Sequence, residues 1–140
     1  MAGAPTDYLA GVPLFAGLSR DDLQQVAQAG DEIQAEAGRE LVTEGRVGRE
    51  FFLILDGDAT VRRGGKEVAK LGPGQYFGEL SLLHRGPRSA SVTADTDMTL
   101  FVLGQREFAG LVDSMHGLAP KLLTGLAQRL READAKTYTY

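Results

Sequence analysis

The segment Phe51-Phe-Leu-Ile-Leu-Asp-Gly-Asp-Ala-Thr-Val-Arg-Arg63 decides how this chain folds. Its first five residues are all apolar, as expected of a strand that is buried on both faces. Asp56-Gly57 is a strong hairpin signal, so residues 59–63 predict the return strand. The apolar run 51–55 is far shorter than the roughly 20 residues that a transmembrane helix needs, so it indicates a buried sheet.

Short strands separated by turns continue on both sides of this segment. Alternating or short apolar runs predict them near Ile33, at 41–43, at 68–71, at 89–94 and at 98–103. Gly64-Gly65 and Gly72-Pro73-Gly74 punctuate the chain as turns. About eight strands at a spacing of roughly 8–12 residues predict a sandwich, barrel or jelly roll.

Helical periodicity appears at both ends of the chain. Ser19, followed by Asp22, is a capping-box start that predicts a helix over residues 20–29, which Gly30 ends in the left-handed conformation. The apolar spacing after Gly104 predicts a second helix from residue 105, and Pro120 lies near the first turn of a last helix over 119–134. The predicted apolar face of that last helix comprises Leu122, Leu123, Leu126, Ala127 and Leu130.

Composition limits the class of protein. The 140 residues carry 15 Lys and Arg against 19 Asp and Glu, a net charge of −4, which argues against a general nucleic-acid binder. Cys is absent, which excludes disulfides and thiolate metal sites, and the start of the chain lacks the pattern of a signal peptide. We expect one cytoplasmic domain over residues 1–140 with a tail at 135–140 and without a membrane or nucleic-acid partner.

The segment from Phe77 to Val92 breaks the strand rhythm and carries the chemistry. Glu79 begins a predicted helical turn directly after Gly78, and the start of a helix presents backbone N–H groups to anions. Arg88, next to Pro87, offers a planar fork that suits phosphate oxygens, whereas a carboxylate such as Glu79 suits a sugar hydroxyl. These residues predict a phosphorylated sugar ligand and leave its identity open.

The sequences Gly74-Gln-Tyr-Phe-Gly-Glu-Leu-Ser-Leu-Leu83 and Pro87-Arg-Ser-Ala-Ser-Val92 resemble the phosphate-binding cassette of cyclic nucleotide-binding domains. The resemblance extends over about residues 12–132, from Val12-Pro-Leu-Phe-Ala-Gly-Leu-Ser19, which is similar to the helical entry of the family, to its B and C helices. It implies a mainly β fold: an eight-stranded β-roll or jelly roll with an N-terminal helix and C-terminal B and C helices.

The resemblance also implies a role for each cassette residue. Glu79 would bind the ribose 2′-hydroxyl and Arg88 the exocyclic phosphate oxygens. The remaining ligand residues implied are Gly78 and Leu80, which shape the turn, Ser81 and Ser89, whose backbone amides lie near the phosphate, and Ala90, which gives backbone room. The implied wall of the base pocket is Val61, Val68 and Ala69.

The residue after the cassette arginine bears on the choice of nucleotide. In the family it is often Thr in cGMP-preferring members and Ala in many cAMP-preferring ones, whereas bacterial cAMP receptors also carry Ser, as at Ser89 here. The resemblance therefore implies cAMP, with cGMP less favoured, and no cofactor.

The implied function is a non-enzymatic receptor in which the ligand closes the B and C helices over the β-roll. Because only a short tail follows the last helix, we expect a stand-alone bacterial member of the family that signals to a separate protein effector. The alternatives are buffering of the nucleotide or a role as one domain of a longer chain, although Met1 and the ends of the sequence favour a complete short protein. The stripe Leu122, Leu126 and Leu130 could serve as a homodimer seam. Tyr138 and Tyr140 could stack on the base, but the tail favours disorder.

Two alternatives remain open. A cupin-type metalloenzyme shares the jelly-roll architecture but needs several His ligands, and His84 and His116 are isolated in the sequence. A ligand-free interaction module of the same fold is the other alternative, against which the presence of both Glu79 and Arg88 argues.

Overall fold

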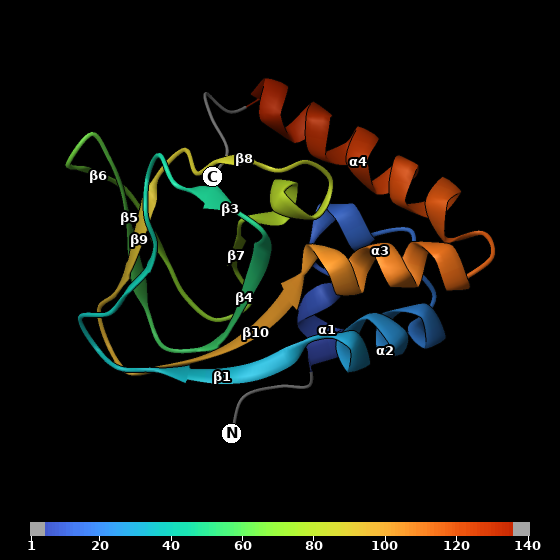
Figure 1. Cartoon of the computed structure of the whole chain (residues 1–140), viewed down its shortest axis with the longest axis horizontal. Coiled ribbons are helices and arrows are strands. Elements are labelled where there is room, and N and C mark those ends of the chain that lie inside the picture. Colours follow the sequence, from blue (N-terminus) through green and yellow to red (C-terminus); the bar gives the residue numbers. More distant parts are fainter. Residues whose placement is uncertain (1–4, 136–140) are drawn as a thin grey trace.

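Two four-stranded antiparallel sheets face each other, and helices cover the outer side of one of them (Figure 1). The computed structural model describes residues 5–135, so the predicted tail from residue 136 onward, with Tyr138 and Tyr140, lies outside the described residues. The first sheet has the order β1 (Asp31–Ala35), β10 (Met98–Gly104), β4 (Glu50–Asp56) and β7 (Tyr76–Phe77). The mainly β fold is confirmed.

The second sheet supplies the other half of the sandwich. Its order is β2 (Glu40–Val42), β9 (Ser91–Ala94), β5 (Ala59–Arg63) and β6 (Lys66–Leu71). A separate two-residue pair joins β3 (Val47–Gly48) to β8 (Gly86–Pro87). The prediction of eight strands therefore holds for the two sheets, and this small pair adds to it.

The predicted hairpin at Asp56-Gly57 is wrong, because β4 and β5 belong to different sheets. Both edges of β4 are already occupied, by β10 on one side and β7 on the other, so the chain must cross to the facing sheet. The Asp58 N–H donates to Thr96 Oγ1 at 3.0 Å, which ties this crossing to the turn before β10. The hairpin forms one turn later, where β5 pairs with β6 around Gly64-Gly65.

The helices outside the sheets are α1 (Pro5–Leu9), the 3₁₀ helix η1 (Pro13–Phe15), α2 (Arg20–Ala29), α3 (Gln105–Ser114) and α4 (Leu118–Ala135). Three of them, α2, α3 and α4, begin at or within one residue of the predicted positions. Ser19 and Asp22 form both hydrogen bonds of the capping box, at 3.1 and 3.3 Å. No helix in the described part of the chain is long and apolar enough to span a membrane.

Gly30 does not take the left-handed conformation that the sequence analysis expected. Its backbone is extended, with φ −102° and ψ 176°. A Cβ atom there would lie 2.3 Å from a ring carbon of Phe101 and 2.6 Å from the Val102 carbonyl oxygen. Glycine is required at this position because β10 passes so close to the end of α2.

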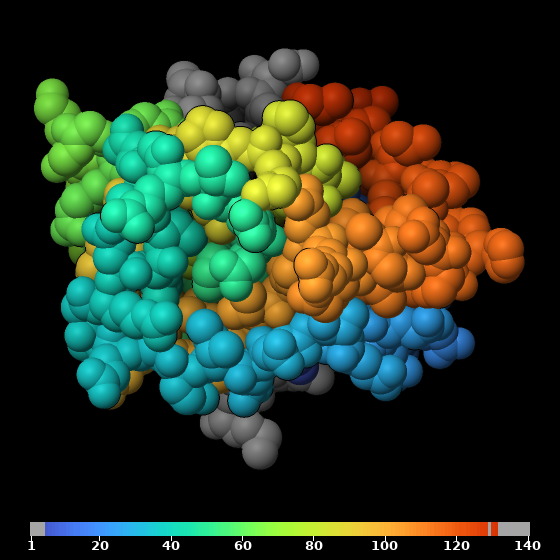
Figure 2. All heavy atoms as spheres, viewed as in Figure 1, coloured from blue at the N-terminus to red at the C-terminus, as the bar shows by residue number. Residues whose placement is uncertain are grey.

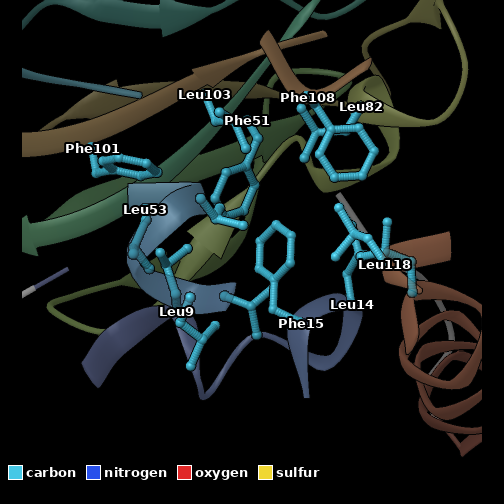
Figure 3. Close-up of a cluster of buried hydrophobic side chains, with 14 of the residues drawn as sticks. Leu9, Leu14, Phe15, Phe51, Leu53, Leu82, Phe101, Leu103, Phe108 and Leu118 are labelled. Carbon is cyan, nitrogen blue, oxygen red and sulfur yellow. The ribbon is translucent and has the colours of Figure 1, made fainter. Parts of the chain in front are cut away.

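Alternate residues of β4 face two separate hydrophobic cores. Phe51, Leu53 and Leu55 pack against the helices, whereas Phe52 and Ile54 pack between the sheets. The rings of Phe15 and Phe51 meet edge to face, with centroids 5.9 Å apart, in the core on the helical side (Figure 3). Burial on both faces explains why this strand is continuously apolar.

The helix α4 packs against η1, and its predicted apolar face is split. Leu122 is buried and Leu126 half-buried, but Leu123 and Leu130 are 65% and 55% exposed, so only part of the stripe faces the molecule. A Cβ at Gly125 would lie 2.2 Å from the Leu14 carbonyl oxygen, which shows how closely α4 approaches η1.

Candidate functional site

A cavity of about 480 Å³ lies where the 3₁₀ helix η2 (Glu79–Leu82) meets the chain leading into β9. Of the seven residues predicted to bind a ligand, six line it: Gly78, Leu80, Ser81, Arg88, Ser89 and Ala90. The structure therefore gathers most of the predicted cassette around one space.

Gly78 leaves room for the Arg88 guanidinium to lie directly against the start of η2. Its φ is +80°, in the left-handed region that favours glycine. A Cβ at this position would lie 2.4 Å from Arg88 Nη1 and 2.7 Å from the Glu50 carbonyl oxygen. Any side chain here would therefore collide with the guanidinium in its present place.

Two hydrogen bonds hold the Arg88 guanidinium at the cavity. Nη1 donates to Ser81 Oγ at 2.9 Å, and Nη2 donates to the Glu50 carbonyl oxygen at 2.8 Å. Since a guanidinium has five N–H donors, others are left for an anion in the cavity that Arg88 lines. Partial burial lowers the pKa of Arg88 from its ordinary value, and the Glu50 carboxylate opposes that shift. The group nevertheless remains a cation at neutral pH.

Backbone hydrogen bonds fix the chain on either side of this arginine. The Arg88 N–H donates to the Arg46 carbonyl at 2.7 Å, and the Arg88 carbonyl accepts from the Gly45 N–H at 2.8 Å. Within residues 5–135, neither the Ser89 N–H nor the Ala90 N–H donates a hydrogen bond. Both residues line the cavity, so these donors are available to an acceptor there.

Glu79 is the one predicted ligand residue that is not part of the cavity lining. It is only 5% exposed and begins η2, between the lining residues Gly78 and Leu80. Glu79 is thus buried between two lining residues of the chain, and its contact with a ribose hydroxyl remains a prediction.

The predicted base wall lies beside the cavity on the second sheet. Val61 is paired in register with Val92, which lines the cavity, and on its other side with Ala69. Partners in register point to the same face of a sheet, so Val61 and Ala69 continue the row that Val92 begins. Val68, the third candidate, is half-buried against the same core.

Several lining residues were not predicted. They are Val42, Phe77, Leu83, His84, Gly86, Pro87 and Val92. Val92 follows Ala90 at the two-residue spacing of one strand face, a signal that could have found it. Val42 comes from β2, far away in the sequence, and only the sheet pairing of β2 with β9 brings it to the site.

A larger cavity, of about 790 Å³, lies near the start of α3 and holds none of the predicted ligand residues. Figure 2 shows α3 (orange) bordering the cassette segment (yellow) on this face. Arg49, Arg85 and Arg106 line it together with three acidic residues, Asp31, Glu50 and Glu107. Balanced charge makes this cavity less suited to an anion than the cavity at Arg88. Within residues 5–135, no three His, Asp or Glu side chains form a group that could hold a metal ion.

A β-sandwich with a glycine-led helical turn and an arginine at one cavity has the chemistry that suits a small anionic ligand. Comparison with known proteins identifies the family of this domain. The family described as the cyclic nucleotide-binding domain matches residues 32–115, and the chain belongs to that family.

The chain is similar both to bacterial regulators and to eukaryotic kinase subunits. It is 31% identical to the N-terminal domain of a transcriptional regulator from Streptomyces coelicolor A3(2), with a TM-score of 0.83 and coverage of 92% of this chain and 93% of that one. It is 36% identical over 129 residues to the cyclic AMP receptor protein of Thermus thermophilus, covering 89% of this chain and 60% of that protein. It is 41% identical over 107 residues to the cAMP-dependent protein kinase regulatory subunit of Eremothecium gossypii, covering 76% of this chain and 23% of that protein. The chain thus spans less than two thirds of the length of these two curated relatives.

Proposed function

We propose that this chain is a non-enzymatic receptor for a cyclic nucleotide, cAMP in preference to cGMP. The observation that carries the proposal is Arg88, whose guanidinium is held at a cavity by Ser81 and by the Glu50 carbonyl oxygen while further N–H groups are left for a ligand. A cyclic phosphate carries one negative charge, which a partly buried guanidinium binds through charge-assisted hydrogen bonds.

The rest of the nucleotide would extend from that phosphate along the cassette. The Ser89 and Ala90 N–H groups would donate to its exocyclic oxygens, and Glu79 would accept from the ribose 2′-hydroxyl. The base would lie toward the apolar row that begins at Val92, which lines the cavity, and continues to Val61 and Ala69.

The preference for cAMP is supported by the relatives and by Ser89. The Thermus receptor and the Eremothecium kinase subunit are both named for cAMP. Another relative, a cGMP-dependent protein kinase from Eimeria tenella, is 33% identical over 124 residues, so cGMP is kept as the second ligand.

Signalling would proceed as a population shift of the C-terminal helices. Leu82 of η2 belongs to the same core as Phe108 of α3 and Leu118 of α4 (Figure 3), so a movement of η2 would be transmitted to both helices. None of the described lining residues of the cavity comes from α3 or α4, so closure over the ligand would require α4 to leave η1. Leu123 and Leu130, which are already exposed on α4, would move with the helix and offer an apolar surface to a separate effector or to a second copy.

Isothermal titration calorimetry with cAMP and cGMP tests the proposal. We expect the wild type to bind cAMP more tightly than cGMP, and Arg88→Leu to weaken binding about 100-fold because it loses the charged fork. Arg39→Leu is the matched control, since Arg39 is exposed in the turn between β1 and β2. A wild type that gives no heat with either nucleotide would refute the proposal.

A further inference from the structure

The turn between β5 and β6 is tied to the cassette from outside the cavity. Arg63, the last residue of β5, donates from Nε to the Ser89 carbonyl oxygen at 3.0 Å. Its neighbour Gly64 donates its N–H to Glu44 Oε1 at 2.9 Å, and the Glu44 N–H donates to Ser91 Oγ at 2.9 Å. Two other segments, the turn at Arg63 and Gly64 and the residue Glu44, therefore meet the chain that follows Arg88.

These contacts fix two peptide units at the site. In a trans peptide the C=O and the following N–H point in opposite directions. The Arg88 carbonyl is held by the Gly45 N–H, which sets the direction of the Ser89 N–H. In the same way, Arg63 holds the Ser89 carbonyl and thereby sets the direction of the Ala90 N–H.

We propose that Arg63 is a positioning residue for phosphate binding, which aims the Ala90 N–H into the cavity by holding the Ser89 carbonyl oxygen on the other side. Arg63 is not a lining residue of the cavity, so it acts through the peptide and not by touching the ligand. Glu44 supports the same arrangement, because it links the turn that carries Arg63 to Ser91. The proposal rests on the proposed function and names a further residue of that site.

Arg62 provides a matched control. It precedes Arg63 on the same strand, is exposed, and pairs in register with Glu67 and Ser91. The test compares Arg63→Met, Arg63→Lys and Arg62→Met with the wild type by calorimetry. The probes are cAMP and its two phosphorothioate diastereomers, in which sulfur replaces one or the other exocyclic oxygen.

Arg63→Met should weaken cAMP binding by about 3- to 10-fold, the effect expected when the hydrogen bond to the Ser89 carbonyl oxygen is lost. It should also bring the affinities of the two diastereomers closer together, because the Ala90 N–H no longer distinguishes the two oxygens. Arg63→Lys should restore most of the affinity, since an ammonium can donate to the same carbonyl. Arg62→Met should bind all three probes as the wild type does.

Wild-type affinity and an unchanged diastereomer ratio in Arg63→Met would overturn the assignment of Arg63 and leave the proposed function intact. A loss of affinity that matches a loss of thermal stability, with an unchanged ratio and no recovery in Arg63→Lys, would also overturn it by showing a merely structural role. A wild type that binds none of the probes would overturn the proposed function itself, and the inference with it.

Discussion

Replacement of Gly78 by alanine tests how the cassette is built. Gly78 and Gly65 have the same φ, +80°, so alanine meets left-handed backbone strain at both positions. The space around them differs. Nothing lies within 4 Å of a Cβ at Gly65, whereas a Cβ at Gly78 would lie 2.4 Å from Arg88 Nη1 and 2.7 Å from the Glu50 carbonyl oxygen.

The expected loss of stability follows from this difference. Left-handed strain costs an alanine about 1–2 kcal/mol at either position. At Gly78 the collision also displaces Arg88 from Ser81 and from the Glu50 carbonyl, two hydrogen bonds that contribute roughly 0.5–1.5 kcal/mol each. We therefore expect Gly78→Ala to lower the free energy of unfolding by about 1–3 kcal/mol more than Gly65→Ala.

Urea unfolding of both variants and the wild type measures this difference, provided that the dependence on urea concentration is unchanged. Calorimetric titration with cAMP should show binding by Gly65→Ala and a severe loss of binding by Gly78→Ala. Equal destabilisation of the two variants, or wild-type affinity in Gly78→Ala, would refute the argument that glycine makes room for the guanidinium.

Two further predictions concern the docking of α4. Gly125→Ala should push α4 away from η1 and speed amide hydrogen exchange in both elements. Gly110→Ala is the control: it lies in open space on α3 and should stabilise the protein by about 0.5–1 kcal/mol. Exchange in Gly125→Ala as slow as in the wild type would contradict the close packing of α4 on η1. Lys121 Nζ lies 2.6 Å from Asp22 Oδ2, and this hydrogen bond is the main reason that the pKa of Asp22 is below its ordinary value. Both side chains are partly exposed, so Lys121→Met should lower the free energy of unfolding at neutral pH by no more than about 1 kcal/mol. Because the pKa of a carboxyl is depressed, this contribution is present above about pH 4 and lost as the pH falls; a difference that persists at pH 2 would contradict the assignment.

Features set by neighbouring residues could be predicted from the sequence. Ser19 and Asp22 are three residues apart and fix the start of α2, and Gly64-Gly65 forms the hairpin between β5 and β6. The ligand residues of the cassette belong to this group, because they lie within the short stretch from Gly78 to Ala90, where Arg88 bonds Ser81. The Glu50 carbonyl oxygen that also holds Arg88 comes from β4 and does not belong to it.

Features set by distant residues could not be predicted in this way. The turn signal at Asp56-Gly57 is local, but both edges of β4 are taken by strands from elsewhere, which sends the chain to the other sheet. The sequence around Gly30 predicts a helix cap, but glycine is needed there because the ring of Phe101, about 70 residues further along the chain, leaves no room for a side chain. The burial of Glu79 depends equally on the packing of η2 against its surroundings.

A crystal structure of the protein grown with cAMP tests the central claim most directly. We predict the cyclic phosphate at the Arg88 guanidinium and at the Ser89 and Ala90 N–H groups, with the ribose 2′-hydroxyl on the Glu79 carboxylate. Nucleotide density in the cavity at the start of α3, or crystals without nucleotide at saturating cAMP, would contradict the claim.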